Sequence, residues 1–82
     1  MTNIRRDAKL KVHIVDAQNL NEGNYLVKVT QDNSVAETNV RTGGSPIWNE
    51  AIVFDIADPN KAIEIELVDS NGNVELKHEL SL

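Results

Sequence analysis

The side chains that most often perform catalysis are few in this sequence, and they are not grouped in a catalytic pattern. The two histidines, His13 and His78, each fall within a segment that alternates polar and apolar residues, as a strand does. The sequence has no cysteine, no glycine-rich phosphate loop and no H-E-x-x-H motif. The serines lie near turns or near the end, outside any G-x-S-x-G segment: Ser34, Ser45, Ser70 and Ser81. We therefore expect a binding module and not an enzyme.

Charge and length limit the partners and the location. The chain has 82 residues, with 13 acidic and 8 basic side chains and a formal net charge of −5. Nucleic-acid binding needs clustered Lys and Arg, so nucleic acid is not an expected partner. No apolar run approaches the roughly 18 residues of a membrane span, and no signal peptide is recognisable. We expect a cytoplasmic protein with an N-terminal arm, residues 1–8, and one domain, residues 9–82.

The apolar residues predict strands, because they recur at every second position almost throughout the chain. Lys9 to Ile14 alternates without a break, and residues 63–67 alternate isoleucine or leucine with glutamate. Glycine, proline, asparagine and aspartate lie between these segments and favour turns. No helix is expected, so the pattern predicts an antiparallel all-β sandwich or barrel. It contains about six strands: residues 9–14, 25–30, 35–41, 47–56, 62–68 and 74–80.

These strands differ in how deeply we expect them to be buried. Residues 47–56 hold the only tryptophan and the only phenylalanine, Trp48 and Phe54, so this strand is expected to anchor the core. Residues 35–41 alternate weakly, which is typical of an edge or solvated strand. One face of the last strand is expected to carry Val74, Leu76, His78 and Leu80.

Several segments resemble the C2 domain family. Ser45-Pro46-Ile47-Trp48-Asn49-Glu50 resembles the family's N-P-x-W-N-E segment, which alternating apolar residues follow. Leu26-Val27-Lys28-Val29 resembles its Y-V-K-V segment, and Ile63-x-Ile65-x-Leu67-Val68-Asp69 its L-x-I-x-V-x-D segment. The opening strand, Leu10-x-Val12-x-Ile14, is also similar, so the resemblance covers residues 9–80 in order. It implies a C2-like β-sandwich that serves as a binding module.

The resemblance implies eight strands, of which this chain supplies about six. A sandwich without the other two leaves backbone groups unpaired at a sheet edge and apolar inner faces uncovered. The domain is then a shortened variant, or a partner protein or second copy supplies the strands, or the sequence is an excerpt of a longer chain. We hypothesise that a protein partner or a second copy binds at the exposed sheet edge.

The resemblance also implies where calcium would bind. In calcium-dependent C2 domains, about five aspartates on the loops at one end supply the charge and oxygen ligands that Ca²⁺ needs. Here Asp69 matches the first aspartate of the family's D-x-D, but asparagines stand at the other matching positions. Amide oxygens coordinate calcium without neutralising its charge, so we expect weak binding of one ion at most, or a plain polar turn. The candidate ligands are Asp69, Asn71, Asn73, Glu22 and Asn24, with Asp16 or Glu75 nearby.

A second surface implied by the resemblance is a basic groove for phospholipid headgroups. The sequence keeps Lys28 and Arg41 there, but Glu37 and Asn39 stand where lysines would alternate. Each cation contributes about 1 kcal/mol near an anionic membrane, so the expected attraction is weak.

We therefore predict a non-enzymatic, C2-like binding module that acts mainly on proteins and is largely independent of calcium. The alternative is a peripheral membrane module with weak calcium-dependent binding to anionic phospholipid. A structural domain without a ligand is the third interpretation. No cofactor is expected, apart from the weak calcium ion.

Overall fold

The described part of the protein consists of strands, turns and loops. The computed structural model describes residues 9–56, 58 and 60–81, and the predicted N-terminal arm lies outside these ranges. They contain no helix. Seven strands follow one another: β1 (Lys9–Asp16), β2 (Asn24–Gln31), β3 (Ser34–Glu37), β4 (Arg41–Thr42), β5 (Ile47–Asp55), β6 (Ile63–Asp69) and β7 (Val74–Leu80).

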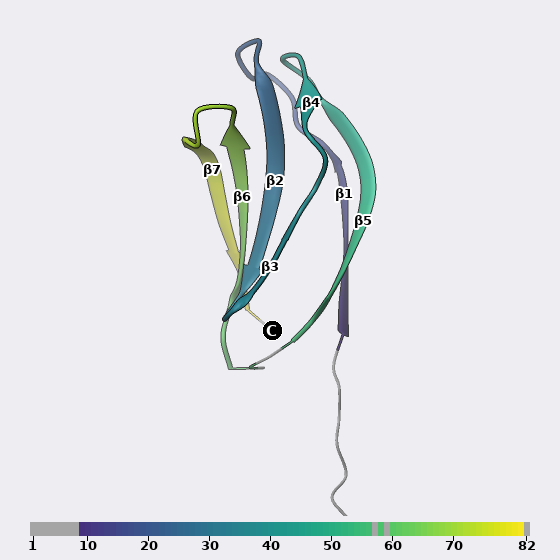
Figure 1. Cartoon of the computed structure of the whole chain (residues 1–82), viewed down its shortest axis with the longest axis vertical. Coiled ribbons are helices and arrows are strands. Elements are labelled where there is room, and N and C mark those ends of the chain that lie inside the picture. Colours follow the sequence, from purple (N-terminus) through teal and green to yellow (C-terminus); the bar gives the residue numbers. More distant parts are fainter. Residues whose placement is uncertain (1–8, 57, 59, 82) are drawn as a thin grey trace, which may run out of the picture.

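Two antiparallel sheets face each other (Figure 1). β1 and β5 form a two-stranded sheet, in which Lys9 lies opposite Asp55 and Val12 opposite Ile52. The other sheet has five strands in the order β3-β2-β6-β7, with the short β4 also paired to β2. The predicted antiparallel β-sandwich is confirmed. Its physical cause is the period of two, which turns every second side chain of a strand toward the facing sheet.

The prediction of one strand over residues 35–41 is wrong, and for this reason the structure has seven strands instead of six. Thr38 interrupts the strand. Its N–H donates to the Val27 carbonyl at 2.9 Å, while its Oγ1 accepts the Val27 N–H at 2.9 Å. A side-chain oxygen thus takes the place of a backbone carbonyl in the ladder, so β3 ends before Thr38 and β4 begins again at Arg41.

The core lies between β2 and β6 of the larger sheet and β5 of the smaller one. Trp48 and Phe54 are buried in it, as predicted. Leu10, Val12 and Ile14 of β1 are only partly buried against it. The buried apolar side chains are Tyr25, Val27, Val29, Trp48, Ile52, Phe54, Ile63 and Leu67. Neither β1 nor β7 contributes to this set.

The last strand does not have the single apolar face that we predicted. A register shift lies between Leu67 and Val68, where Val74 pairs with Val68 but Leu76 pairs with Leu67. Cross-strand neighbours point to the same face of a sheet. Val74 therefore accompanies Val68 and does not share the inner face with Leu76.

Every residue of β7 is exposed, including those on the face that is turned toward the other sheet. Leu76 lies opposite Leu67, which is 5% exposed, yet Leu76 itself is 62% exposed. Leu80 lies opposite Ile63, which is 1% exposed, yet Leu80 is 42% exposed. The two-stranded sheet covers the inner face of β2 and β6, and it is too narrow to cover that of β7.

Candidate functional site

The candidate calcium ligands lie on loops at one end of the sandwich, at the top of Figure 1. The loop before β2 is joined to the loop before β5 by backbone hydrogen bonds. The Leu20 N–H donates to the Gly44 carbonyl and the Gly43 N–H to the Gly23 carbonyl, both at 2.8 Å. At Gly44, a Cβ atom would lie 2.7 Å from the Leu20 carbonyl oxygen. This close approach of two backbones requires a glycine.

Asp69 closes the loop between β6 and β7 with its own side chain. Its Oδ1 accepts the backbone N–H groups of Asn71 and Asn73, each at 2.9 Å. The Asp69 N–H donates to the Asn73 carbonyl at 3.0 Å. The N–H of Asn73, followed by that of Asn71, holds the pKa of the Asp69 carboxyl below its ordinary value, although burial opposes this. The loop is therefore a polar turn that its own hydrogen bonds stabilise.

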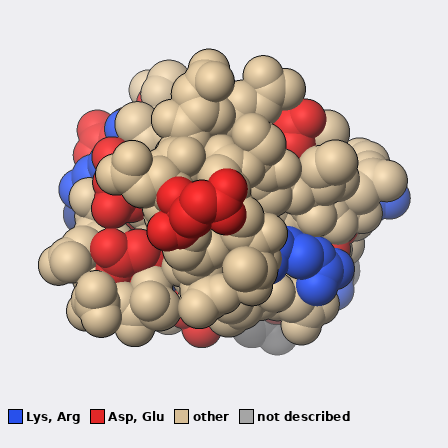
Figure 2. Space-filling model, turned by 90° about the horizontal axis from the view of Figure 1, so that it is seen from above, with Lys and Arg blue, Asp and Glu red and all other residues tan. Residues whose placement is uncertain are grey.

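Negative charge gathers around Tyr25 at the same end. Burial raises the pKa of the Tyr25 phenol, and the carboxylates of Glu75, Asp69 and Glu22 raise it further. Figure 2 looks onto this end and shows acidic side chains at its centre and along one side. The structure thus brings two candidate ligands, Glu22 and Asp69, into one region together with Glu75. Within the described residues, no three His, Cys, Asp or Glu side chains are arranged to hold a metal ion.

The asparagine candidates already take part in hydrogen bonds within this end. The Asn24 Oδ1 accepts the Thr42 hydroxyl of β4 at 2.6 Å. Asn71 and Asn73 donate their backbone N–H groups to Asp69. A calcium ion would compete with the contacts of Asn24 and Asp69, and the metal site stays a prediction.

Lys28, a candidate for headgroup binding, lies between two glutamates on the outer face of the larger sheet. It is opposite Glu37 of β3 and Glu66 of β6, and Glu66 is in turn opposite Lys77 of β7. Opposite charges at such positions attract by about 0.2–1 kcal/mol for each pair. Charge alternates along this row, so an anionic headgroup that approaches Lys28 also meets two carboxylates.

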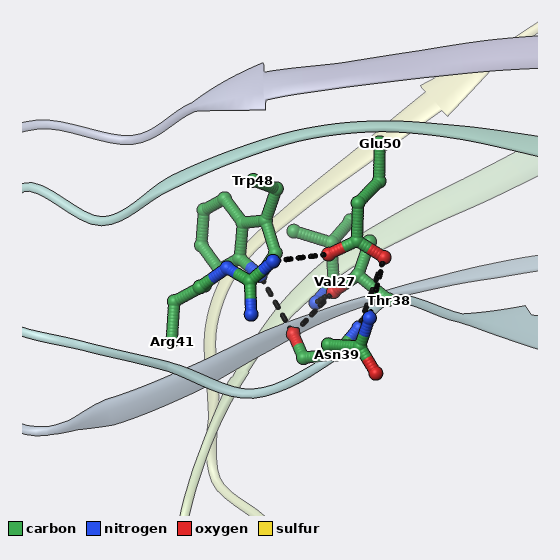
Figure 3. Close-up of polar contacts among 6 residues, drawn as sticks. All are labelled: Val27, Thr38, Asn39, Arg41, Trp48 and Glu50. Atoms are coloured by element: carbon green, nitrogen blue, oxygen red, sulfur yellow. Dashed lines mark hydrogen bonds and ion pairs between the residues drawn. The ribbon is translucent and has the colours of Figure 1, made fainter.

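Arg41 belongs to a polar network around Trp48 and Glu50 (Figure 3). Its Nη2 lies 3.5 Å from the Glu50 Oε2, an enclosed oxygen that has no hydrogen bond within the described residues. The Glu50 Oε1 accepts the Asn39 N–H at 3.3 Å and the Asn39 Nδ2 at 3.1 Å. The Asn39 carbonyl accepts the Trp48 Nε1–H at 2.8 Å and the Thr38 hydroxyl at 3.0 Å. The tryptophan and glutamate of the W-N-E segment thus hold the stretch that separates β3 from β4.

The two candidate headgroup cations are not brought together. Arg41 lies opposite Tyr25 and its guanidinium reaches Glu50 on the facing sheet, so it is on the inner side. Lys28 alternates with the buried Val27 and Val29 and points outward. The difference arises because β4 pairs with β2 through an odd-numbered, inward-pointing residue.

A groove that the sequence did not indicate opens between β1 and the pair β6–β7. Its volume is about 570 Å³, and its lining includes Ile14 of β1, Ile65 of β6 and Leu76 of β7, with Trp48 beneath. Among the described residues, β1 pairs only with β5, so its other edge is free. We predicted an exposed edge but not its place, because the alternation within one strand does not tell how wide the facing sheet is.

Comparison with known proteins follows the fold. A model of the C2 domain family matches residues 8–80. The chain belongs to the C2 domain family. It is similar to the two C2 domains, A and B, of Extended-Synaptotagmin 2, with 23% identity and a TM-score of 0.80 over 90% of this chain and 27% of that chain. It is also similar to a C2 domain-containing protein from a putative elicitor-responsive gene, with 21% identity and a TM-score of 0.74 over 93% of this chain and 65% of that chain.

This C2 chain therefore spans less than two thirds of either solved chain. No curated protein matches its sequence significantly. C2 domains commonly bind membrane lipids or proteins, and they are generally binding modules and not enzymes. A helix long and apolar enough to cross a membrane is not found among the described residues.

Proposed function

We propose that this C2 domain binds a protein partner, without calcium, through the groove between β1 and β6–β7. The observation that carries the proposal is the exposure of apolar inner-face side chains, of which Leu76, at 62%, is the clearest. An uncovered apolar surface beside a free strand edge favours protein binding. A lipid headgroup offers phosphate oxygens, and these would fill neither the apolar groove nor the hydrogen-bonding groups of the edge.

Calcium independence is supported by the hydrogen bonds of the candidate ligands. Asp69 accepts two backbone N–H groups through Oδ1, and Asn24 accepts the Thr42 hydroxyl. Calcium would have to replace some of these bonds, while the asparagines bring no charge to balance the ion. A loop that is already closed by its own hydrogen bonds keeps its shape without an ion.

Weak attraction for anionic membranes is supported by the neighbours of the two candidate cations. Lys28 faces Glu37 and Glu66, and Arg41 is paired with Glu50. The chain carries a net charge of −5, which also disfavours nucleic acid. Under this proposal the protein acts in the cytoplasm.

One observation favours a second candidate function. The carboxylates of Glu75, Asp69 and Glu22 act together on Tyr25, so a cation at this end would find a negative potential. A bound calcium ion would reduce the repulsion from an anionic membrane. The alternative is therefore a peripheral membrane module with weak calcium binding at Asp69, Asn71, Asn73, Glu22 and Asn24.

Co-sedimentation with phosphatidylserine vesicles tests the proposal, in about 1 mM calcium, where a weak C2-type site would fill, and in chelator. We expect the protein to stay in the supernatant in both buffers. Asp69→Asn is the matched variant, because it removes one charge and keeps the side-chain shape. Calcium-dependent pelleting that this variant loses would establish the alternative and overturn the proposal.

A further inference from the structure

We infer that the groove receives one extended segment of a partner protein, which adds a strand to the free edge of β1. The segment carries apolar side chains on its inner face and acidic side chains on its outer face. This inference rests on the proposed protein-binding function and names the chemistry of the partner. Backbone, inner face and outer face of the site each define one property of the segment.

The backbone of β1 defines the extended conformation. β1 has eight residues, and within the described part of the chain it pairs on one side only, with β5. An edge strand presents a row of N–H and C=O groups without partners, which an added strand satisfies. Such a strand would lie about 4.8 Å from β1, in the layer of the two-stranded sheet. It would extend that sheet over the part of β6–β7 that is now uncovered.

The uncovered face defines the apolar side of the segment. The groove is bordered by Ile14 on β1, Ile65 on β6 and Leu76 on β7. Leu80 lies further along β7 on the same face as Leu76 and is 42% exposed. The side chains of an added strand alternate between its two faces, so every second residue would point into this groove. Apolar residues at these positions would bury the exposed leucines.

The outer face of β1 defines the charge of the segment. Lys9, Lys11 and His13 alternate with the partly buried Leu10 and Val12, and so they point away from the core. Lys9 is 3.5 Å from Asp55 across the sheet, whereas Lys11 has no ion-pair partner within the described residues. Side chains on the outer face of an added strand would lie beside this basic column, where acidic residues are favoured.

The same column argues against the pairing of β1 with β1 of a second copy. Two copies of β1 would bring Lys9 and Lys11 of one chain beside the same basic residues of the other. Like charges on neighbouring strands are destabilising, and lysines on edge strands oppose such pairing. A partner segment with alternating apolar and acidic residues meets no such repulsion.

Synthetic peptides long enough to span β1 test the inference with the whole chain. The probe alternates isoleucine with glutamate, one control carries lysine in place of glutamate, and another has the probe's residues in scrambled order. Trp48 is the only tryptophan and lines the groove, so its fluorescence reports docking. Hydrogen exchange of the β1 amides reports strand addition. We expect the probe to bind saturably, to protect β1 and to bind roughly tenfold or more tightly than either control.

Two pairs of variants locate the contact. Leu76→Gln should weaken probe binding roughly tenfold or more, because it removes an apolar side chain from the groove. Val53→Gln is its matched control, since Val53 is 58% exposed on the outer face of β5. Lys11→Glu should reverse the preference from the acidic to the basic peptide. Lys61→Glu makes the same charge change at an exposed position outside the groove and should leave the preference unchanged.

The failures of the two proposals are distinguishable. Calcium-dependent pelleting with vesicles would overturn the proposed function. No pelleting, combined with equal binding or no binding of all the peptides, would overturn only the present inference. A doubled mass in light scattering, with protection of β1 in the absence of peptide, would also overturn it and identify a second copy as the occupant.

Discussion

Replacement of Thr38 by valine tests whether a side chain maintains the break between β3 and β4. Valine has nearly the same shape but offers no oxygen. The Val27 N–H, whose acceptor is the Thr38 Oγ1 at 2.9 Å, would lose its partner in the interior. The Asn39 carbonyl would keep the Trp48 Nε1–H as a donor at 2.8 Å and so loses less. The cost of the substitution is therefore mainly that of one unsatisfied backbone donor.

The size of this cost follows from burial. Thr38 is 7% exposed, so water does not replace the lost acceptor without rearrangement. A buried donor left without a partner costs about 1–3 kcal/mol. The whole chain is expected to have a free energy of unfolding of about 4–12 kcal/mol, so the loss is a substantial part of it. The melting temperature should fall by about 4–8 °C for each kcal/mol lost.

Urea unfolding, followed by the fluorescence of Trp48, measures the effect. Thr30→Val is the matched control, because Thr30 is a half-buried residue of β2 whose hydroxyl makes no hydrogen bond within the described residues. We expect the control to change the free energy of unfolding by less than about 0.5 kcal/mol. If Thr38→Val costs no more than Thr30→Val, the explanation of the strand break by the Thr38 side chain is wrong.

Three further predictions concern the loops and the charged row. Gly44→Ala should destabilise the protein by about 1–3 kcal/mol in urea unfolding, because its Cβ would meet a backbone carbonyl at 2.7 Å. Gly23→Ala, where the nearest atom is at 3.5 Å, should cost much less, and equal costs would contradict the packing argument. Asp69 has a lowered pKa in the folded protein, so its stabilising effect is present above its ordinary pKa of 3.8 and is lost as the pH falls through the folded value. The stability advantage of the wild type over Asp69→Asn should therefore shrink below about pH 4, and a gap independent of pH in unfolding experiments would refute this. Glu66→Gln removes a carboxylate opposite Lys28 and should raise binding to anionic vesicles up to about fivefold in chelator at low salt. Unchanged sedimentation would show that this glutamate does not weaken the attraction of Lys28 for lipid.

The alternation of apolar residues was sufficient to predict the strands that build the core. β2, β5 and β6 each bury alternate side chains on the face that the sequence indicates, with Trp48 and Phe54 at the centre. This works because the side chains of a strand point to opposite faces in turn, whatever its neighbours are. The W-N-E segment was equally informative, since it led to the C2 family that the match over residues 8–80 confirms.

Hydrogen bonds between distant segments were not predictable in this way. Thr38 reads as one residue of a weakly alternating strand, and only its contact with Val27, 11 positions earlier in the chain, shows why the strand breaks there. The register shift beside Val68 is a similar case, because it depends on the pairing of two strands and moves Val74 away from the face of Leu76.

By itself, the sequence determined the fold class, the faces of the central strands and the net negative charge. The tertiary structure alone decided which surfaces are free to bind. Lys28 and Arg41 point to opposite faces because of the register between β2 and β4. Leu76 has the alternation of a buried residue and is exposed because the facing sheet has only two strands in the described part of the chain. Alternation tells which way a side chain points, but burial also requires another element on that side, and the sequence of one strand holds no information about it.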